Sequence, residues 1–529
     1  MPAVNFNLRW PDGPPQECYC PSTVIERYLA ENASYPADEL LRRCRIAFER
    51  AGERVREQRG FMCTAAPQQL AEIEQRVRTI APGSRAVVQV LALRREPASP
   101  KFPAPQALSG HVEAVVVGGG QAGLATSFYL REQGIHHVVL ERDRVASSWR
   151  DDRWDAFCLV TPNWQCRLPS FPYRGDDPSG FMLKDEIVAY VEGFAASFAA
   201  PVYEGVAVKR VTSGDECFRV TTSLGAITTD QVILAVGGYH SPSVPPLGAK
   251  LPSYISQLHS SRYRNASSLP DGAVLVVGSG QSGAQIAEDL HLAGREVHLS
   301  VGSAPRVARS YRGRDCVAWL EDMGHYEMPI ERHPEGLAAR KEPNHYVTGR
   351  DGGHDIDLRA LALEGMHLHG RLLSVDGDGD GDGDGLAFAG DLRANLDAAD
   401  ATAERIKDAI DGFIDEHSIE APVQERYQPV WSPAGDHTSE IGLRSAGLTS
   451  VVWATGFRSD WSWVQAPAFE PSGYPSHHRG VTTVPGLYVI GLPWLHTWGS
   501  GRFAGVSRDA LYVAERVAEN AISRTRAAA

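Results

Sequence analysis

Two stretches of the chain repeat the same order of apolar and polar positions. Residues 115–130 read VVVGGGQAGLATSFYL, and residues 275–290 read LVVGSGQSGAQIAEDL. In each, an apolar run of strand length leads through closely spaced glycines into an amphipathic helical pattern. Strand-like and helix-like patterns alternate from residue 112 onward, which is typical of a doubly wound α/β fold. We therefore predict an α/β chain with two Rossmann-like dinucleotide-binding domains.

A smaller unit precedes these two domains. Patterns of strand, helix, helix and strand lie there at residues 4–10, 36–60, 66–80 and 85–94. Prolines then recur between residues 97 and 105, at a density that excludes helices and central strands. We expect a small α/β accessory domain at 1–96 and a Pro-rich linker at 97–111.

Composition narrows the class of protein. The chain has 529 residues, enough for several domains, and its net charge of −13 argues against a nucleic-acid partner. No apolar run is long enough to span a membrane, and the first residues lack a signal-peptide pattern. The eight cysteines are scattered without metal-binding spacing, so we expect no metal site and a cytoplasmic location. The run DGDGDGDGDG at 376–385 lacks the glutamate that closes a calcium loop, and we expect a hairpin turn.

The first glycine turn carries a full dinucleotide-binding signature. Gly118, Gly120 and Gly123 have GxGxxG spacing. In that pattern the first glycine allows a tight turn, the second lets a pyrophosphate approach the backbone, and the third lets helix pack on strand. The next strand ends at Glu141, whose carboxylate would bind ribose hydroxyls and repel a 2′-phosphate. This turn therefore favours FAD or NAD over NADP.

The second turn differs at the end of its second strand. Gly278, Gly280 and Gly283 repeat the spacing, but the strand REVHLS ends at Ser300, where no acid stands. The segment that follows contains Arg306, Arg309, Arg312 and Arg314. Guanidinium groups pair bidentately with phosphate, so we expect NADPH here, with Arg306 as the best candidate for its 2′-phosphate. For any one of these arginines, a solvated loop is an equally good interpretation.

The order of these motifs resembles the flavin-containing monooxygenase family. VVWATGFRSD matches the family's ATG-[FY] element, and AVGGYHSPSVPP resembles its chain crossing between domains. PGLYVIGLPWLHTWGSGRFAG resembles its closing FAD contact. The stretch SYISQLHSSRY departs from the family fingerprint, since His259 and Tyr263 fit but Ser253 and Ile255 replace Phe and Gly.

The resemblance implies an NADPH domain inserted into a FAD domain. The FAD-binding domain would occupy 112–250 and 441–529, and the NADPH-binding domain 251–440. Further cofactor contacts implied by the resemblance are Trp149, Arg150, Val208, Gly237, Thr455, Gly456, Gly491 and Leu492.

A bacterial group offers a closer resemblance. Residues 112–520, with TPNWQCRLPSFPY and GRDGGHDIDLR, resemble flavin-dependent oxidoreductases whose genes cluster with a nitrilase gene. Residues 1–96, with RWPDG, CYCPS and GFMCTAA, resemble a nitrogen-starvation response protein of the same clusters. The chain then reads as a fusion of two neighbours.

Two nucleotide sites suggest that NADPH passes a hydride to the flavin. A disulfide reductase would need a redox cysteine pair, and Cys158 and Cys166 lack its short spacing. We predict a monooxygenase that uses O₂, through a flavin C4a-hydroperoxide, on a small nitrogen-containing metabolite. That substrate class rests on the gene-cluster resemblance. The alternative is an NADPH oxidase or reductase without oxygen transfer, with residues 1–96 as a binding module. A homodimer is left open.

Candidate site residues come from the same resemblance. Asn163 in LVTPNWQ matches an Asn that the family places beside the reactive flavin face, and we take it as the catalytic candidate. The alternative is a turn-forming Asn after a proline. Candidate substrate contacts are Trp494, His496, Trp498 and His354, with Phe503 in the same aromatic cluster. Core packing is the alternative for these aromatic side chains.

Overall fold

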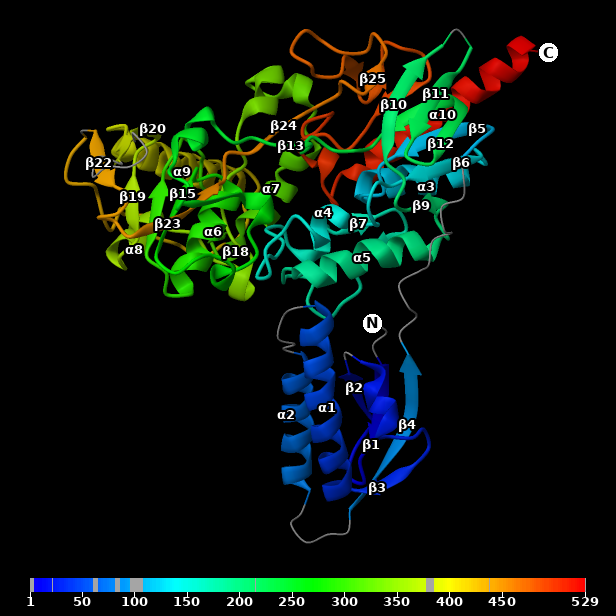
Figure 1. Cartoon of the computed structure of the whole chain (residues 1–529), viewed down its shortest axis with the longest axis vertical. Helices are drawn as coiled ribbons and strands as arrows, with labels where there is room; N and C mark the ends of the chain where they lie inside the picture. The colour runs from blue at the N-terminus through cyan, green and yellow to red at the C-terminus, as the bar shows by residue number, and fades with distance from the viewer. Residues whose placement is uncertain are drawn as a thin grey trace. The chain divides into compact units, whose positions relative to one another are not determined.

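A computed structural model describes residues 4–20, 22–59, 65–80, 86–95, 108–214, 216–376, 385–436 and 438–528. The chain divides into two compact units, Met1–Lys101 and Phe102–Ala529, which are described separately (Figure 1). Most of the predicted Pro-rich linker and the centre of the Asp-Gly run lie outside the described residues. No helix within the described ranges is long and apolar enough to cross a membrane.

The N-terminal unit is the small α/β domain that the sequence predicts. Its antiparallel sheet has the order β2-β1-β4-β3. Alternating Val4, Phe6 and Leu8 point into a core that is shared with the two helices, since successive side chains of a strand face opposite sides. The elements are β1 (Val4–Arg9), β2 (Gln16–Cys20), β3 (Ser34–Pro36), α1 (Ala37–Arg59), α2 (Ala65–Thr79) and β4 (Val87–Arg95).

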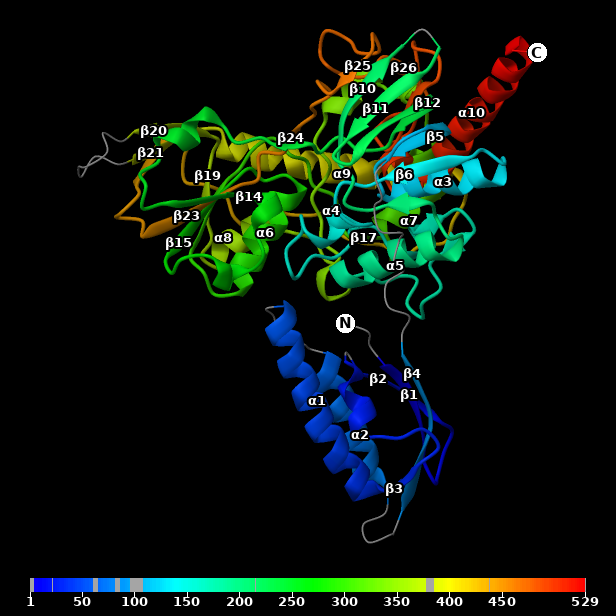
Figure 2. The ribbon, with the colours of Figure 1, turned by 45° about the vertical axis from the view of Figure 1, so that its right-hand side comes forward.

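The first nucleotide-binding domain has three layers. A parallel sheet has an antiparallel meander on one face and helices on the other, and Figure 2 shows the meander strands side by side. The sheet strands are β5 (His111–Val117), β6 (His137–Leu140), β9 (Val202–Tyr203), β12 (Gly225–Leu234) and β28 (Leu487–Val489). The meander adds β10 (Val208–Ser213) and β11 (Phe218–Thr222) to β12. The helices are α3 (Gln121–Glu132), α5 (Lys184–Ser197) and α10 (Val506–Ala528).

The second nucleotide-binding domain repeats this plan with a five-stranded parallel sheet. In sheet order its strands are β14 (Ser256–His259), β23 (Leu448–Trp453), β15 (Ala273–Val277), β16 (Val297–Ser300) and β19 (His367–His369). Helices α6 (Gln281–Leu292) and α9 (Leu392–Glu416) cover one face. A three-stranded sheet of β20 (Leu372–Asp376), β21 (Gly385–Phe388) and β22 (Ser439–Gly442) covers the other. Strands β20 and β21 pair antiparallel on either side of the Asp-Gly run, as expected for a hairpin.

The boundary predicted at residue 441 is wrong. Strand β23 pairs with both β14 and β15, so it belongs to the second domain and not to the returning part of the first. The chain crosses back at β24 (Phe457–Arg458), which pairs antiparallel with β13 (Ser241–Pro242) on the outgoing crossing. An apolar strand that is buried on both faces fits either parallel sheet, so its composition alone does not assign it.

Short elements complete the chain. They are α4 (Ser147–Arg150), β7 (Arg167–Leu168), β8 (Phe171–Pro172), β17 (Ser310–Tyr311), β18 (Arg314–Asp315), α7 (Cys316–Asp322), α8 (Leu358–Leu363), β25 (Val464–Gln465), β26 (His477–His478) and β27 (Val481–Thr482). Several 3₁₀ turns lie between them.

A buried ion network joins α8 to α9. Arg359, 2% exposed, lies 2.9 Å from Asp400 through Nε and 2.5 Å from Asp397 through Nη2. It also donates to the Trp431 carbonyl oxygen at 2.8 Å. Burial raises the pKa of Asp400, against the opposing effect of Arg306 and Arg359. Without Arg359, Asp400 would keep its pair with Arg306 at 2.9 Å, but it would lose one of its two cationic partners, and the Trp431 carbonyl oxygen would lose this donor.

We predict that Arg359→Met lowers the free energy of unfolding by about 1.5–3 kcal/mol, because it removes buried hydrogen bonds to charged groups while Arg306 still compensates Asp400. The matched control is Arg371→Met, because Arg371 is 66% exposed in its pair with Asp391. An exposed pair contributes at most about 1 kcal/mol. Urea denaturation of the full chain measures both. Equal losses in the two variants would contradict the prediction.

Candidate functional site

The first glycine turn is built by close backbone contacts. Gly118 has φ +112°, and a Cβ there would lie 2.6 Å from the Ala235 carbonyl oxygen. A Cβ at Gly123 would lie 1.9 Å from the Gly118 carbonyl oxygen. By contrast, a Cβ at Gly120 would meet no atom within 4 Å. Two glycines therefore allow the packing, and the third leaves open space at the N-terminus of α3, where a pyrophosphate fits.

Glu141 stands beside this turn, as the sequence predicts. Its Oε2 accepts a hydrogen bond from the Gly119 N–H at 2.7 Å, and its Oε1 accepts one from the Asp143 N–H at 2.9 Å. Burial raises the pKa of Glu141, and the two N–H donors oppose that shift. Each carboxylate oxygen keeps a second lone pair, so the group can also accept from ribose hydroxyls.

The second turn has the same geometry. Gly278 has φ +103°, and a Cβ there would lie 2.7 Å from the Ala454 carbonyl oxygen. A Cβ at Gly283 would lie 1.8 Å from the Gly278 carbonyl oxygen, while one at Gly280 would meet nothing within 4 Å. The residues of both turns thus fit a dinucleotide.

In each domain, the residue that follows the second strand lies beside the glycine turn. In the second domain, the sequence-based prediction chose a residue one position too early. The Gly118 N–H donates to Leu140 and the Gly278 N–H donates to Ser300, so Val301, not Ser300, is the counterpart of Glu141. Ser300 faces the other side of the sheet, where its hydroxyl donates to the Gly370 carbonyl oxygen at 3.1 Å. The conclusion that no acid stands there is unchanged, because Val301 is apolar and buried.

The four arginines that follow β16 all lie in ion pairs. Arg306 is 5% exposed, lies 2.9 Å from Asp400 and stacks on Tyr427 at 4.0 Å. Arg309, Arg312 and Arg314 pair with Asp315, Asp411 and Asp322 respectively. In this structure Arg306 is therefore the buried partner of a carboxylate, and its contact with a 2′-phosphate stays a prediction.

Residues 490–505, which we call the closing segment, return from the end of β28 to the first turn. Gly491 has φ +80°, and a Cβ there would lie 2.6 Å from the Ala122 side chain. Gln121, which the sequence reading missed, accepts from Trp149 Nε1 at 3.2 Å and donates to the Gly501 carbonyl oxygen at 3.1 Å. Its position directly after Gly120 could have identified it as a site residue from the sequence alone. The turn, α4 and the closing segment are thereby brought together.

Other predicted cofactor contacts lie around this first site. Trp149 stacks on Phe503 with ring centroids 5.6 Å apart. Arg150 pairs with Glu192 of α5 at 2.5 Å. Val208 begins β10 and packs on the meander core, and Leu492 is buried in the same core. Their contacts with a cofactor stay predictions.

Gly237, Thr455 and Gly456 lie at the crossings between the two domains. Gly237 and Gly456 have φ values of +70° and +76°. The Thr455 hydroxyl donates to the Ser243 carbonyl oxygen, and the Ser243 N–H donates to the Gly456 carbonyl oxygen. His259 lies 2.9 Å from the same Gly456 oxygen through Nε2. The two crossings are therefore bonded to each other.

Asn163 is committed to its own loop. Its Nδ2 donates to the Asp177 carbonyl oxygen at 3.0 Å, and its Oδ1 accepts from the Met182 N–H at 2.7 Å. These bonds agree with the turn-forming alternative. A contact between Asn163 and the flavin stays a prediction.

The aromatic candidates are packed against the second domain. Buried Trp494 contacts Ile330 and Ala339, and the His496 carbonyl oxygen accepts from the Ile330 N–H at 2.7 Å. Trp498 lies 4.7 Å from the Tyr326 ring, and Arg502 lies over its indole at 3.4 Å. The sequence did not predict that Tyr326 and Arg502 lie around Trp498, because these residues come together only where the two domains pack against each other.

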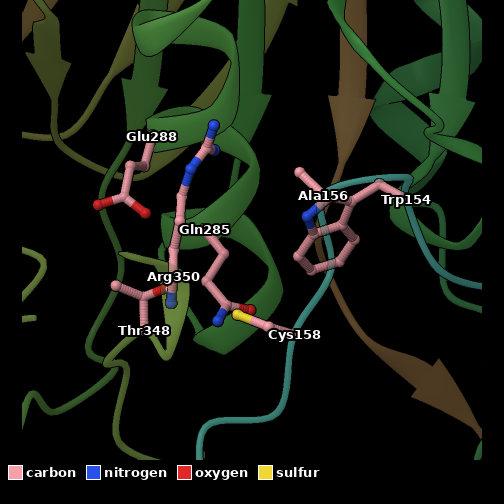
Figure 3. Close-up of a pocket in the computed structure, with 7 residues that line it drawn as sticks. All are labelled: Trp154, Ala156, Cys158, Gln285, Glu288, Thr348 and Arg350. Atoms are coloured by element: carbon pink, nitrogen blue, oxygen red, sulfur yellow. The ribbon is translucent and has the colours of Figure 1, made fainter. Parts of the chain in front are cut away.

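A pocket lies where the two nucleotide-binding domains meet (Figure 3). It is lined by Trp154, Ala156, Cys158, Gln285, Glu288, Thr348 and Arg350. His354, a predicted substrate contact, lies 2.8 Å from Glu288, and Arg350 lies 2.9 Å from Asp289. Gln285 is buried, and its Oε1 has no hydrogen-bond partner.

Comparisons with known proteins agree with this architecture. The family model described as "Pyridine nucleotide-disulphide oxidoreductase" matches residues 115–321, and "Nitrogen starvation-induced protein NitG" matches residues 5–93. A CzcO-like oxidoreductase of Geobacillus kaustophilus is 32% identical over 76% of this chain and 97% of its own length. Indole-3-pyruvate monooxygenase YUCCA1 of Oryza sativa subsp. japonica is 32% identical over 34% of this chain and 44% of its own length.

A solved structure shows the same fold. The flavin-containing monooxygenase of Stenotrophomonas maltophilia is 20% identical, with a TM-score of 0.52 over 78% of this chain and 99% of that one. The predicted fold class, with two dinucleotide-binding domains and a small N-terminal domain, is confirmed, and so is the predicted resemblance of both parts.

The two glycines of the first turn give a matched test. We predict that Gly120→Ala folds normally but weakens dinucleotide binding by about 1–3 kcal/mol, because its methyl fills the open space and displaces hydrogen bonds to the pyrophosphate. Gly123→Ala should instead destabilise the fold by about 1–3 kcal/mol or more, because its Cβ overlaps a backbone oxygen. Flavin content and thermal unfolding measure the two effects. Normal flavin content in a folded Gly120→Ala protein would contradict the assignment.

Proposed function

Because the chain belongs to the family of the CzcO-like oxidoreductases, we propose that it is a monooxygenase that oxygenates a small nitrogen-containing metabolite. Its cofactors are FAD and NADPH, as the sequence predicts. The two glycine turns would hold the nucleotides, and bound FAD would supply the transfer of electrons from NADPH to O₂. The protein's contribution is to bind and orient both nucleotides and to exclude water.

The observation that carries the proposal is the contrast between two otherwise equal glycine turns. Glu141 places a carboxylate beside the first turn, where it favours ribose hydroxyls and disfavours a 2′-phosphate. At the second turn Val301 occupies that place, and Ser279 Oγ accepts from the Gly302 N–H at 3.0 Å. This contrast supports FAD at the first turn and NADPH at the second.

The cysteines argue against a disulfide as electron acceptor. None of the seven cysteines among the described residues is in a disulfide. Burial raises the pKa of Cys166 to about 12 and also raises that of Cys158. A thiolate is the reactive form, so these buried thiols are poorly suited to dithiol chemistry. Burial of these thiols favours O₂ as the acceptor.

The closing segment supports the exclusion of water. Gly491 and Gly501 hold it against the start of α3, next to the first turn. Its aromatic side chains, Trp494 and Trp498, are covered by residues of the second domain. A dry and pre-organised site keeps reactive oxygen species from decomposing before they meet substrate.

The substrate class rests on the N-terminal domain. Residues 5–93 match a family described as induced by nitrogen starvation, and the bacterial oxidoreductases that residues 112–520 resemble have genes that cluster with a nitrilase gene. Amines, oximes and nitriles are the candidate substrates. We also propose that residues 1–96 bind a partner or ligand rather than take part in the redox chemistry.

Coenzyme choice can be tested by adding an acid to the second turn. A Cβ at Gly302 would meet no atom within 4 Å, so a side chain fits there. Wild-type flavin should be reduced faster by NADPH than by NADH in anaerobic stopped-flow. Gly302→Asp should reduce this preference about tenfold by charge repulsion with the 2′-phosphate, whereas the neutral Gly302→Asn should retain it. Equal use of both coenzymes by the wild type would contradict NADPH at this turn.

The fate of oxygen decides the reaction type. We predict that protein supplied with NADPH and ¹⁸O₂ transfers one labelled atom to a member of a panel of amines, oximes and nitriles. Mass spectrometry of the products measures the label, and the control reaction uses H₂¹⁸O with unlabelled O₂. If no product carries label and every electron is recovered in hydrogen peroxide, the protein is an NADPH oxidase instead.

A further inference from the structure

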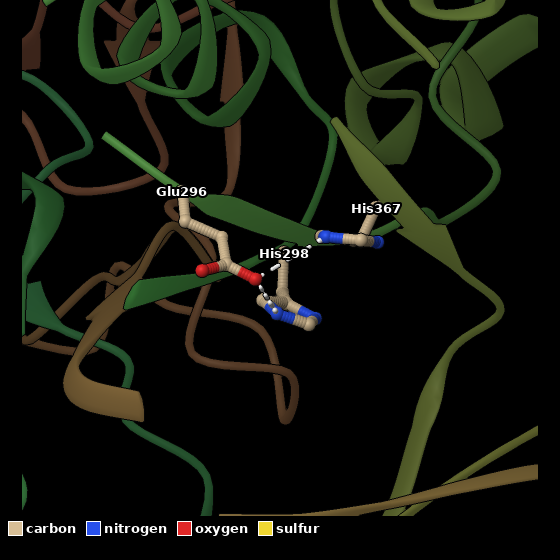
Figure 4. A group of neighbouring side chains, drawn as sticks. All are labelled: Glu296, His298 and His367. Atoms are coloured by element: carbon tan, nitrogen blue, oxygen red, sulfur yellow. Dashed lines mark ion pairs between the residues drawn. The ribbon is translucent and has the colours of Figure 1, made fainter. Parts of the chain in front are cut away.

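Two neighbouring strands of the second domain bring acid and imidazole side chains to one face of the sheet. Glu296 immediately precedes β16, His298 lies within it, and His367 begins the edge strand β19. His298 and His367 stand opposite each other in the parallel pair. Glu296 is two residues from His298 and therefore on the same face. Figure 4 shows the three side chains converging.

The ligand atoms lie at nearly the spacing of a metal's coordination shell. Glu296 Oε1 is 3.4 Å from His367 Nε2 and 3.9 Å from His298 Nε2. One ligand atom from each residue lies within 4.8 Å of the other two. Around Zn²⁺, bonds of about 2.0–2.2 Å place tetrahedral ligand atoms about 3.4 Å apart. Glu296 and His367 are 56% and 50% exposed, so both can move that distance freely.

His298 provides the second and independent observation. It is 5% exposed, and its Nε2 is buried without a hydrogen-bond partner. Its Nδ1 lies 2.9 Å from His369 Nε2. When Nδ1 carries the proton and donates to His369, Nε2 keeps a free lone pair 3.9 Å from Glu296 Oε1. The His367 ring stacks on His298 with centroids 4.5 Å apart, and rotation of this half-exposed side chain would bring its nitrogen to the same ion. Metal-binding histidines commonly donate their other ring N–H in this way.

His369 is itself held in place. Its ring stacks on Phe388 of β21 with centroids 4.4 Å apart, and it lies nearly coplanar with the His298 ring, with 7° between the two planes. The cluster thus lies on the face that is covered by β20–β22, not on the face of α6. It is also at the amino-terminal end of the strands, whereas the glycine turn follows their carboxyl ends. It is separate from the nucleotide site.

We propose that Glu296, His298 and His367 form a binding site for a divalent first-row transition metal, with Zn²⁺ as the preferred ion and water in the fourth position. Two imidazoles and one carboxylate suit Zn²⁺, whereas Ca²⁺ and Mg²⁺ require oxygen ligands. The metal would tie the edge strand β19 to β16. The sequence predicted no metal site, because its cysteines lack metal-binding spacing; the Glu296, His298 and His367 cluster forms only when two strands that lie far apart in the chain pair.

The test uses the untagged full-length protein, stripped of metal and titrated with ZnCl₂ by calorimetry. We expect one equivalent of tight binding, weakened at least tenfold in His367→Gln and in Glu296→Gln. Both side chains are half exposed, so these variants should fold normally. The matched control is His111→Gln. His111 is 49% exposed and lies 3.4 Å from Asp230, so it is a similarly exposed histidine that pairs with one carboxylate.

Three calorimetric results would each overturn the proposal: absence of Zn²⁺ binding by the wild type, unchanged binding by His367→Gln, or an equal loss in the His111→Gln control. X-ray absorption at the zinc edge separates this site from the cysteines. We expect nitrogen and oxygen scattering with imidazole features. A sulfur shell would assign the zinc to thiolates and would also overturn the proposal.

Discussion

The contact between a helix and the carbonyl oxygen of its own glycine turn is the constraint on which both nucleotide sites depend. Any side chain at Gly123 or Gly283 would collide with that oxygen. Close approach aims the helix N-terminus at the end of the strand and leaves the space at Gly120 and Gly280 open. The neighbouring strand takes part as well, because Ala235 and Ala454 place backbone oxygens and small side chains against the two turns.

This shared requirement shows a repeat that the motifs alone concealed. The ATG element at Ala454–Gly456 and the residues Ala235–Gly237 occupy the same place in their domains. Each follows the strand beside its turn, and each ends in a glycine with positive φ. The two segments, which the family resemblance gives as separate motifs, are therefore structurally equivalent in the two domains.

Features of the sites that depend on contacts between neighbouring residues in the chain were predictable from the sequence. Features that depend on contacts between distant residues were not. The glycine turns and Glu141 were predictable, because strand, turn and helix follow one another along the chain. The ion pair of Arg306 with Asp400 was not predictable, because the two residues lie far apart in the sequence. Ser300 was chosen in place of Val301, because only the hydrogen-bond register fixes the strand end. The cluster around His298 requires the pairing of β16 with β19, which no local pattern encodes.

The two crossings between the nucleotide-binding domains restrict how those domains can move. Strands β13 and β24 run side by side and are bonded to each other, and Gly237 and Gly456 precede them. A body suspended from two adjacent tethers swings about the line that joins their attachment points, but it does not slide or turn freely. The crossings alone would leave the inserted domain this one rotation, and that rotation would have to break the packing of Trp494 on Ile330 and the bond from the Ile330 N–H to the His496 carbonyl oxygen.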